Sequence, residues 1–322
     1  MFLENQTRYP ALLFRGGIDE QRFCASVTAR ITYDLTPEGL REAEDQAWTV
    51  SAEPWQGPHG GPMESDEVFY RGGVDLFVFG AARPLADDPT RGRVTVRLGD
   101  HPPRQIRVFG ERLWERQGER LVPGRPRAFE TVPLDLSSAF GGCDRWDGLE
   151  IPFPDNPLGK GFYLEAESAA GRPLPQLESP DAPIRNWDDR PEPVATCAAP
   201  LGFGPRLKRF LEIDETTGAI RRIDPRLFNT ALPGMIFPSA DPGDVVEVTG
   251  VARELPPRFA IPDPRLRIRL AFDDETIEAE PRVDQIGIEC EAGRVFVGWR
   301  YPFRYHMFPL QRRSCELTRL PL

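Results

Sequence analysis

The sequence predicts a mainly β protein in which two antiparallel β lobes, sandwich or barrel-like, flank a loop-rich centre with few short helices. Alternating apolar and polar residues fill the first and last parts of the chain, and this alternation is typical of half-buried strands. The 322 residues include 35 prolines and 29 glycines, and proline is at about twice its usual share of roughly 5%. Between residues 136 and 241 the periodicity fades. We therefore expect one domain over residues 1–322, with sub-lobes 1–135, 136–241 and 242–322.

Four segments in the first part of the chain are predicted to be strands. The first is followed by residues 36–39 (TPEG), whose proline and glycine predict a turn and a return strand. Gly110 lies inside the fourth segment and predicts a β-bulge there. The four segments are Phe23–Leu35, Val74–Ala81, Arg93–Leu98 and Gln105–Trp114.

The centre opens with the run Ala139–Phe162, which is rich in glycine, proline and aromatic residues. No helical or strand period fits this run, and its aromatic residues give it apolar surface to bury. We therefore expect an ordered, irregular loop. Farther along, Pro205–Glu212 predicts a short helix, and Pro225–Ala231 predicts a helical turn with Asp224 as its N-cap.

Strands return beyond Pro242. Acidic residues at 273–275, and Glu-Ala-Gly at 291–293, predict hairpin turns between neighbouring strands. The predicted strands are Asp244–Ala252, Arg265–Phe272, Thr276–Glu280, Gln285–Cys290 and Arg294–Tyr301.

Charge and cysteine content limit the classes of partner and the compartment. A net charge of −10 disfavours nucleic acid and anionic membranes as partners. The five cysteines are scattered without a CxxC pair, which is typical of reduced thiols in a cytoplasm. The first residues lack the basic start and apolar stretch of a signal peptide, and no run approaches the roughly 18 apolar residues of a membrane span. We expect a soluble, cytoplasmic protein that binds neither nucleic acid nor membrane.

The sequence contains no recognisable catalytic or metal-binding pattern. The three histidines are far apart in sequence, and no His/Cys spacing of a metal site occurs. Cys143, beside two glycines, could pair with a histidine as a nucleophile, but a structural thiol is the commoner role. Gly159-Lys160-Gly161 does not complete a P-loop, because Phe162 stands where the hydroxyl residue belongs. We expect no enzymatic activity and no cofactor.

The alternative is a carbohydrate-active or glycan-binding β protein. Such a protein would use loop carboxylates together with Trp146 or Trp187, because glycoside hydrolysis needs two carboxyl groups at a fixed separation. The candidate carboxylates near aromatic residues are Asp144, Asp147, Asp155, Asp188 and Asp189.

Six short motifs, taken in order, resemble one bacterial family. They are AFGG at Ala139–Gly142, NPLGKGF at Asn156–Phe162, PxLExP at Pro175–Pro180, PLGFGP at Pro200–Pro205, DxxxFNxA at Asp224–Ala231 and GDVVEVTG at Gly243–Gly250. Over roughly residues 75–257 the chain is similar to the family catalogued as domain of unknown function 2169. Members of that family accompany toxic effectors of the type VI secretion system. One departure is the short stretch before the FNxA motif, and another is Pro233-Gly234, which stand where similar proteins often carry an Asp-Gln pair.

The resemblance implies a non-enzymatic adaptor or chaperone in the bacterial cytoplasm. Such a protein binds a cognate effector and assists its loading onto the VgrG–PAAR spike, with VgrG or PAAR as further partners. The motif loops would form either the partner-binding surface or an internal brace that fixes that surface. The residues singled out in these loops are Phe140, Gly141, Gly142, Trp146, Asn156, Gly159, Lys160, Gly161, Phe162, Gly202, Phe203, Gly204, Phe228 and Asn229.

Overall fold

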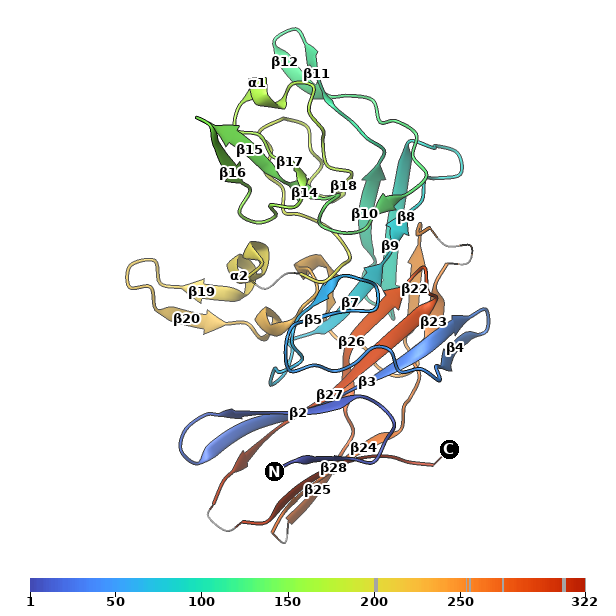
Figure 1. Cartoon of the computed structure of the whole chain (residues 1–322), viewed down its shortest axis with the longest axis vertical. Coiled ribbons are helices and arrows are strands. Elements are labelled where there is room, and N and C mark those ends of the chain that lie inside the picture. The colour runs from blue at the N-terminus through green and yellow to red at the C-terminus, as the bar shows by residue number, and fades with distance from the viewer. Residues whose placement is uncertain (200–201, 253, 255, 274, 309–310, 322) are drawn as a thin grey trace.

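The computed structural model describes residues 1–322 except 200–201, 253, 255, 274, 309–310 and 322. The protein is elongated and mainly β, with three larger sheets stacked along its long axis and several two-stranded ribbons (Figure 1). The prediction of a mainly β protein with few short helices is therefore confirmed. Among the described residues the strands form no closed barrel, and α-helix is confined to α1 (Ala166–Ala169) and α2 (Gly204–Phe210).

The central sheet has the strand order β2-β3-β27-β26-β7-β21, with β4 paired to β3. Its longest contact joins β3 and β27 in antiparallel register from Asp34↔Arg294 to Arg22↔His306. β7 is buried along its whole length and pairs in parallel with β26. The strands are β2 (Ala11–Gly17), β3 (Arg22–Thr36), β4 (Gly39–Glu42), β7 (Val74–Phe79), β21 (Ile236–Phe237), β26 (Arg282–Glu289) and β27 (Arg294–His306).

Two further sheets flank the central one (Figure 1). One has the order β18-β10-β9-β22-β23 and the other β1-β28-β24-β25. Their strands are β1 (Leu3–Asn5), β9 (Arg91–Leu98), β10 (Arg104–Phe109), β18 (Leu177–Glu178), β22 (Val245–Thr249), β23 (Arg258–Ala260), β24 (Leu266–Phe272), β25 (Glu275–Ala279) and β28 (Arg313–Arg319).

All three larger sheets combine strands from the first and last parts of the chain. The predicted sub-lobes 1–135 and 242–322 therefore share their larger sheets and do not form separate ones. The pairing is mostly antiparallel, as predicted, but three pairs are parallel: β1 with β28, β7 with β26, and β14 (Phe140–Gly141) with β17 (Lys160–Gly161). Long, apolar strands such as β3 and β27 satisfy each other's backbone groups and bury each other's side chains, so they pair despite their separation in sequence.

Short elements build the loop-rich centre and the connections. A second, smaller hydrophobic cluster lies here, and Trp114, Phe140, Phe162, Tyr163 and Leu174 are among its members. The elements are β5 (Trp55–Gln56), β6 (Pro62–Met63), β8 (Ala81–Ala82), β11 (Trp114–Gln117), β12 (Arg120–Pro123), β13 (Val132–Pro133), β14 (Phe140–Gly141), β15 (Cys143–Trp146), β16 (Leu149–Pro152), β17 (Lys160–Gly161), β19 (Leu211–Ile213), β20 (Ile220–Ile223) and the 3-10 turns η1 (Pro225–Phe228) and η2 (Pro233–Met235).

Most predicted elements are present, with two exceptions. The run Ala139–Phe162, predicted to be an irregular loop, contains the β15–β16 hairpin and the short β14–β17 pair, because Asp147 and Gly148 both take the positive φ that a tight hairpin turn requires. The predicted helix, the turn capped by Asp224 and the hairpin turns all form; Asp274 of one turn lies outside the described residues. The predicted strand Gln105–Trp114, however, ends at Phe109, so Gly110 is not a bulge. A Cβ at Gly110 would lie 1.8 Å from the carbonyl oxygen of Arg127, so the residue has to be glycine because another segment packs against its backbone.

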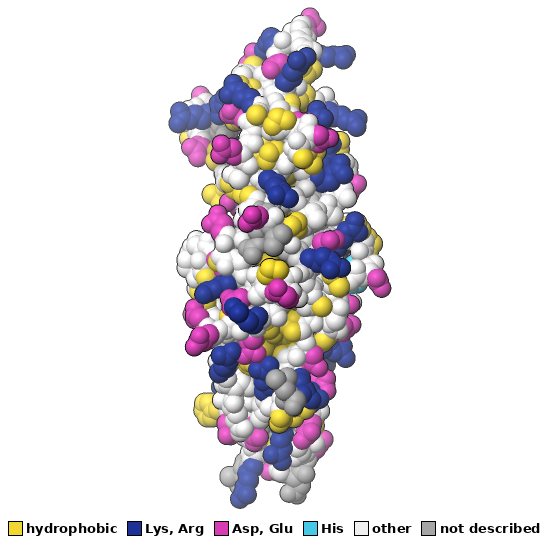
Figure 2. Space-filling model, turned by 90° about the vertical axis from the view of Figure 1, so that its right-hand side faces the viewer, with side chains coloured by type: hydrophobic (Ala, Val, Ile, Leu, Met, Phe, Trp, Pro, Cys, Tyr) yellow, Lys and Arg dark blue, Asp and Glu magenta, His cyan; other side chains and the backbone are white. Residues whose placement is uncertain are grey.

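The surface carries both signs of charge. On the face shown in Figure 2, basic and acidic side chains are interspersed rather than gathered by sign, with hydrophobic side chains scattered between them. No helix in the described part of the chain combines the length and the apolar character needed to span a bilayer.

Candidate functional site

A cleft of about 980 Å³ lies at the ends of β7 and β26. Its floor is apolar and includes the buried side chains of Met63, Phe79 and Leu136. Leu158 and Phe228, which are 70% and 43% exposed, also line it. The lining residues lie within 54–68, 78–80, 134–137, 197–199, 227–228 and 289–291 and at 158 and 206. Several segments that are distant in sequence therefore have to fold before this cleft exists.

His59 forms part of one wall and is held by stacking. Its ring centroid lies 3.8 Å from that of Phe79 and 5.3 Å from that of Trp48. Gly57 and Gly61 make room for the ring, because a Cβ at either position would lie within 2.6 Å of the imidazole. Burial lowers the pKa of His59 to about 4, so the imidazole is neutral at pH 7.

This pKa predicts a pH dependence of stability. The unfolded chain binds a proton at His59 below its ordinary pKa of 6.5, whereas the folded chain does so only near 4. The unfolded state therefore binds more protons between these values, and stability falls as the pH drops through this range. Because the ring is only half-buried, we expect a loss of about 1 kcal/mol between pH 7 and pH 5.

Urea unfolding at both pH values measures this loss directly. A His59→Phe variant keeps an aromatic ring against Phe79 but has no titratable group, so its loss between the two pH values should be smaller. An equal loss in both proteins would show that His59 is not the responsible group.

Arg206 of α2 forms the only ion pair found within the described lining. Its guanidinium donates to both carboxylate oxygens of Glu64, at 2.9 and 3.3 Å, and to the carbonyl oxygen of Asn229 at 2.7 Å. The Arg206 side chain is 6% exposed, so its charge is satisfied inside the protein and is not presented to the cleft.

The remaining charged groups of the lining are acidic. They are Glu67, Asp135, Glu289 and Glu291, and none of them forms an ion pair with another described residue. Oε2 of Glu289 is buried without a hydrogen-bond partner within the described structure. The cleft therefore combines an apolar floor with uncompensated negative charge.

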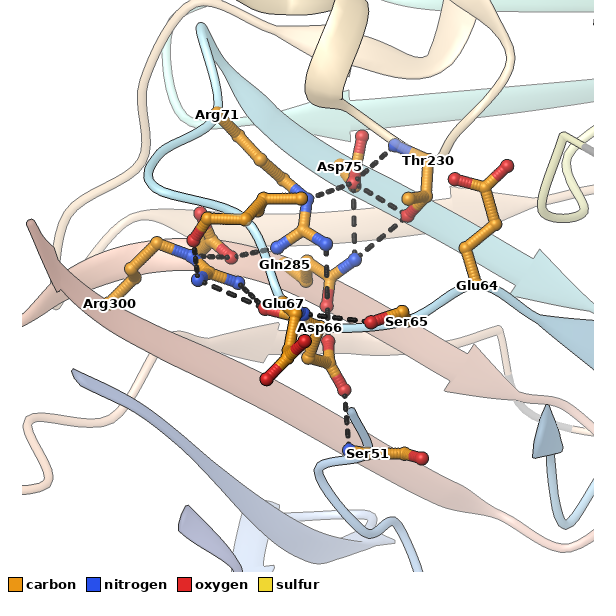
Figure 3. Close-up of polar contacts among 12 residues, drawn as sticks. Ser51, Glu64, Ser65, Asp66, Glu67, Arg71, Asp75, Thr230, Gln285 and Arg300 are labelled. Atoms are coloured by element: carbon orange, nitrogen blue, oxygen red, sulfur yellow. Dashed lines mark hydrogen bonds and ion pairs between the residues drawn. The ribbon is translucent and has the colours of Figure 1, made fainter. Parts of the chain in front are cut away.

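Next to the cleft lies a buried network of three arginines and three aspartates, of which Figure 3 labels Arg71, Arg300, Asp66 and Asp75. Arg30 donates to Asp66 at 2.7 Å, Arg300 donates to Asp284 at 3.0 Å, and Arg71 pairs with Asp284 and, at 3.4 Å, with Asp75. Burial alone would raise the pKa of Asp284, but Arg300 and Arg71 hold it below its ordinary value, so this carboxyl stays ionised.

Asp75 is the most heavily hydrogen-bonded member of this network. It accepts hydrogen bonds from the backbone N–H of Thr230 at 2.9 Å and of Ala231 at 3.1 Å, and from the side chains of Asn229 and Gln285. Through these hydrogen bonds, Asp75 links the FNxA motif to strands β7 and β26.

The network and the cleft share the same chain segments. Glu64 and Glu67 line the cleft, while Asp66 between them is buried in the network (Figure 3). Likewise Phe228 lines the cleft and Asn229, the next residue, bonds to Asp75. The buried charges therefore fix the positions of the cleft walls.

The AFGG and NPLGKGF motifs fold against each other. β14 and β17 pair Phe140 with Lys160 and Gly141 with Gly161. Asn156 is buried, and its Nδ2 donates to the carbonyl oxygens of Leu136 at 2.8 Å and Phe140 at 2.9 Å. These bonds hold the 134–137 wall of the cleft against the loop that presents Leu158.

The glycines of these two motifs face other backbone segments. Gly141 has φ +146° and Gly142 φ +96°, and a Cβ at Gly141 would lie 2.1 Å from the carbonyl oxygen of Asn156. A Cβ at Gly159 would meet Asn156 Nδ2 at 2.5 Å, and one at Gly161 would meet Pro175 at 2.6 Å. A side chain at any of these positions would collide with neighbouring atoms, which is the packing expected of an internal brace.

The other residues singled out in this region divide between interior and surface. Phe140 and Phe162 are buried in the second cluster, and the Lys160 ammonium donates to Gln176 Oε1 at 3.0 Å. Trp146 is 52% exposed next to the Asp147-Gly148 turn, where it pairs with Leu149 across the β15–β16 hairpin. None of these residues lines the cleft in the described structure.

The GFGP motif supports the start of α2. Pro200 and Leu201 lie outside the described residues. Gly202 is exposed, Phe203 is 3% exposed in the main core, and a Cβ at Gly204 would lie 2.2 Å from Asp155 Oδ1. Of the fourteen residues singled out from the sequence, Phe228 alone is among the described lining residues. The motif residues thus mostly support the walls of the cleft from within and do not line it.

Cys143 and three of the five carboxylates considered for catalysis serve other contacts. Cys143 donates to the carbonyl oxygen of Pro157, and burial together with Glu150 raises its pKa, so it is not an activated thiolate. Asp144 accepts from the Leu164 N–H and Ser168, Asp155 pairs with Lys208, and Asp189 caps residues 185 and 186. The described residues contain no group of three or more His, Cys, Asp or Glu side chains placed to hold a metal ion.

Sequence reasoning did not identify the acidic lining or the His59 wall. The cluster QGPHGGP at residues 56–62 does indicate a tight turn around a histidine. Charged residues inside apolar strands, such as Arg30 and Asp75, indicate that each has a buried partner of opposite charge. Neither signal reveals which segments meet in space.

Comparison with known proteins gives one match. A family model described as "Uncharacterized protein conserved in bacteria (DUF2169)" matches residues 20–300. Neither the curated proteins nor the solved structures contain a match. The matched range is wider than the span of the six motifs and includes the whole lining of the cleft.

Proposed function

Because this chain belongs to the DUF2169 family of bacterial proteins, we propose that it is a cytoplasmic, non-enzymatic adaptor or chaperone. Its client is a cognate toxin effector of the type VI secretion system. The protein keeps that effector soluble and assists its loading onto the VgrG–PAAR spike. The secretion role rests on the resemblance carried by the six motifs, and the binding role rests on the cleft.

The observation that carries the binding role is the preorganised cleft. An adaptor needs a rigid surface that covers apolar segments of its client, and preorganisation lowers the entropy lost on binding. Here the apolar floor is fixed by the Arg–Asp network and by the glycine-rich brace. Leu158 and Phe228 remain exposed at the cleft, where large apolar side chains are typical anchors for a partner.

Co-expression with the products of neighbouring genes tests the proposal. We expect one of these products to become more soluble and to co-purify with the chain, and the complex to retain added VgrG or PAAR protein. The double variant Leu158→Asp/Phe228→Asp should lose this partner, because it places two charges on the apolar surface without touching a buried residue.

The control is Ile277→Asp on β25, an apolar residue whose exposure is similar to that of Phe228 and which does not line the cleft in the described structure. It should bind as the wild type does, and all variants should keep the wild-type melting temperature. If no neighbouring product binds, or if the protein hydrolyses oligosaccharides, the adaptor assignment is wrong.

A further inference from the structure

We propose that the cleft binds a segment of the partner that carries hydrophobic side chains and at least one lysine or arginine, whose cation meets Glu289. This inference rests on the proposed adaptor function and specifies the chemistry of the segment that is bound. Three features of the cleft lead to it.

The first feature is the size and polarity of the cavity. Its volume of about 980 Å³ is at the upper end of the roughly 300–1,000 Å³ that ligand pockets usually span. Met63, Phe79 and Leu136 give it an apolar floor, and Leu158 and Phe228 extend the apolar lining to exposed positions. Hydrophobic side chains of a partner would bury this surface.

The second feature is the sign of the charge. Glu67, Asp135, Glu289 and Glu291 contribute carboxylates without a paired cation among the described residues. The two basic side chains of the lining do not offset them, since Arg206 is bound to Glu64 and His59 is neutral at pH 7. An acidic segment would be repelled, whereas a basic one would be attracted and oriented.

The third feature is Glu289 itself. It is the last residue of β26, only half-buried as a whole, but its Oε2 atom is shielded from solvent and has no hydrogen-bond partner in the described structure. A buried carboxylate oxygen without a donor is costly. Because Glu289 is only half-buried and lines the cleft, its carboxylate can turn toward a cation there. A lysine ammonium or an arginine guanidinium then supplies N–H donors and the opposite charge, which offsets this cost.

Selection from a phage-displayed library of short linear random peptides tests the inference. The bait is the full wild-type chain. We expect the enriched peptides to combine Leu, Ile, Phe or Val with Lys or Arg and to be depleted of Asp and Glu. Binding of a selected, fluorescently labelled peptide should weaken as salt is raised, because part of the attraction is electrostatic.

Two matched charge variants locate the interaction. Glu289→Gln/Glu291→Gln keeps the side-chain shape and removes two negative charges. This variant should raise the Kd of the labelled peptide by at least about tenfold. Glu275→Gln/Glu278→Gln makes the same charge change on the exposed strand β25 and should leave the affinity within about twofold. Wild-type melting temperatures exclude misfolding as the cause of a loss.

The outcomes separate this inference from the adaptor function. Enrichment of acidic peptides, no enrichment, or equal binding by the two charge variants would overturn the cationic-segment inference. The adaptor function would survive such a failure if the wild-type chain still captures a neighbouring gene product and Leu158→Asp/Phe228→Asp does not. If the enriched peptides combine hydrophobic and basic residues, and only Glu289→Gln/Glu291→Gln lowers the affinity for them, the result would support both the cationic-segment inference and the adaptor function.

Discussion

Asp75→Ala is expected to lower the free energy of unfolding by about 3–5 kcal/mol, the usual cost of removing one partner from a buried ion pair. Asp75 is fully buried and lies 3.4 Å from Arg71 Nε. Its removal leaves the N–H groups of Thr230 and Ala231 without their acceptor and leaves a buried guanidinium with less compensating charge. Urea unfolding followed by circular dichroism measures the change. Because the network fixes the walls, partner binding should fall as well.

The matched control is Asp34→Ala, which removes an aspartate of the same sheet from an exposed pair with Arg41. Exposed pairs contribute about 0–1 kcal/mol, so this variant should unfold close to the wild type. If Asp75→Ala costs no more than Asp34→Ala, the buried network does not stabilise the fold in the way its geometry indicates.

Gly141→Ala is expected to cost about 2–6 kcal/mol of unfolding free energy. The new Cβ would lie 2.1 Å from the carbonyl oxygen of Asn156, at a backbone φ of +146° that L residues rarely adopt. Backbone strain of this kind costs of order 1–3 kcal/mol, and overpacking adds about 1–3 kcal/mol. The measurements are soluble yield, thermal unfolding and partner capture, each recorded separately.

Gly148→Ala provides the comparison, since it also places a side chain at positive φ, +78°, but in open space at the tip of the β15–β16 hairpin. It should cost only about 1–2 kcal/mol. A Gly141→Ala protein that folds as the wild type does but no longer captures its partner would assign AFGG to the interface and not to the brace.

Local features of the chain were predictable because their causes are local. Alternation with a period of two identified β3, β9 and β24, and Asp224 before a proline identified the start of η1. The pairing of those strands was not predictable in the same way. β3 pairs with β27 across more than two hundred residues, and no periodic pattern encodes the choice between such distant partners.

The site was predictable only in part, for a related reason. The glycines of AFGG and NPLGKGF marked backbone that must pack closely, and the structure shows what each one packs against. The cleft, however, is formed by side chains such as Glu67 and Glu289 that have no distinctive neighbours in sequence. Nothing local separates these residues from any solvated glutamate.

The contact between β3 and β27 also bears on how the protein is made. The edge of β3 that β27 covers has no partner until residues 294–306 have left the ribosome, so the central sheet cannot close before the more than two hundred residues between the two strands have been made. An unpaired, apolar strand edge invites pairing with other nascent chains, and sheets built from distant segments form slowly. Until β27 has been made, this protein is therefore itself a candidate client of the cell's general folding machinery.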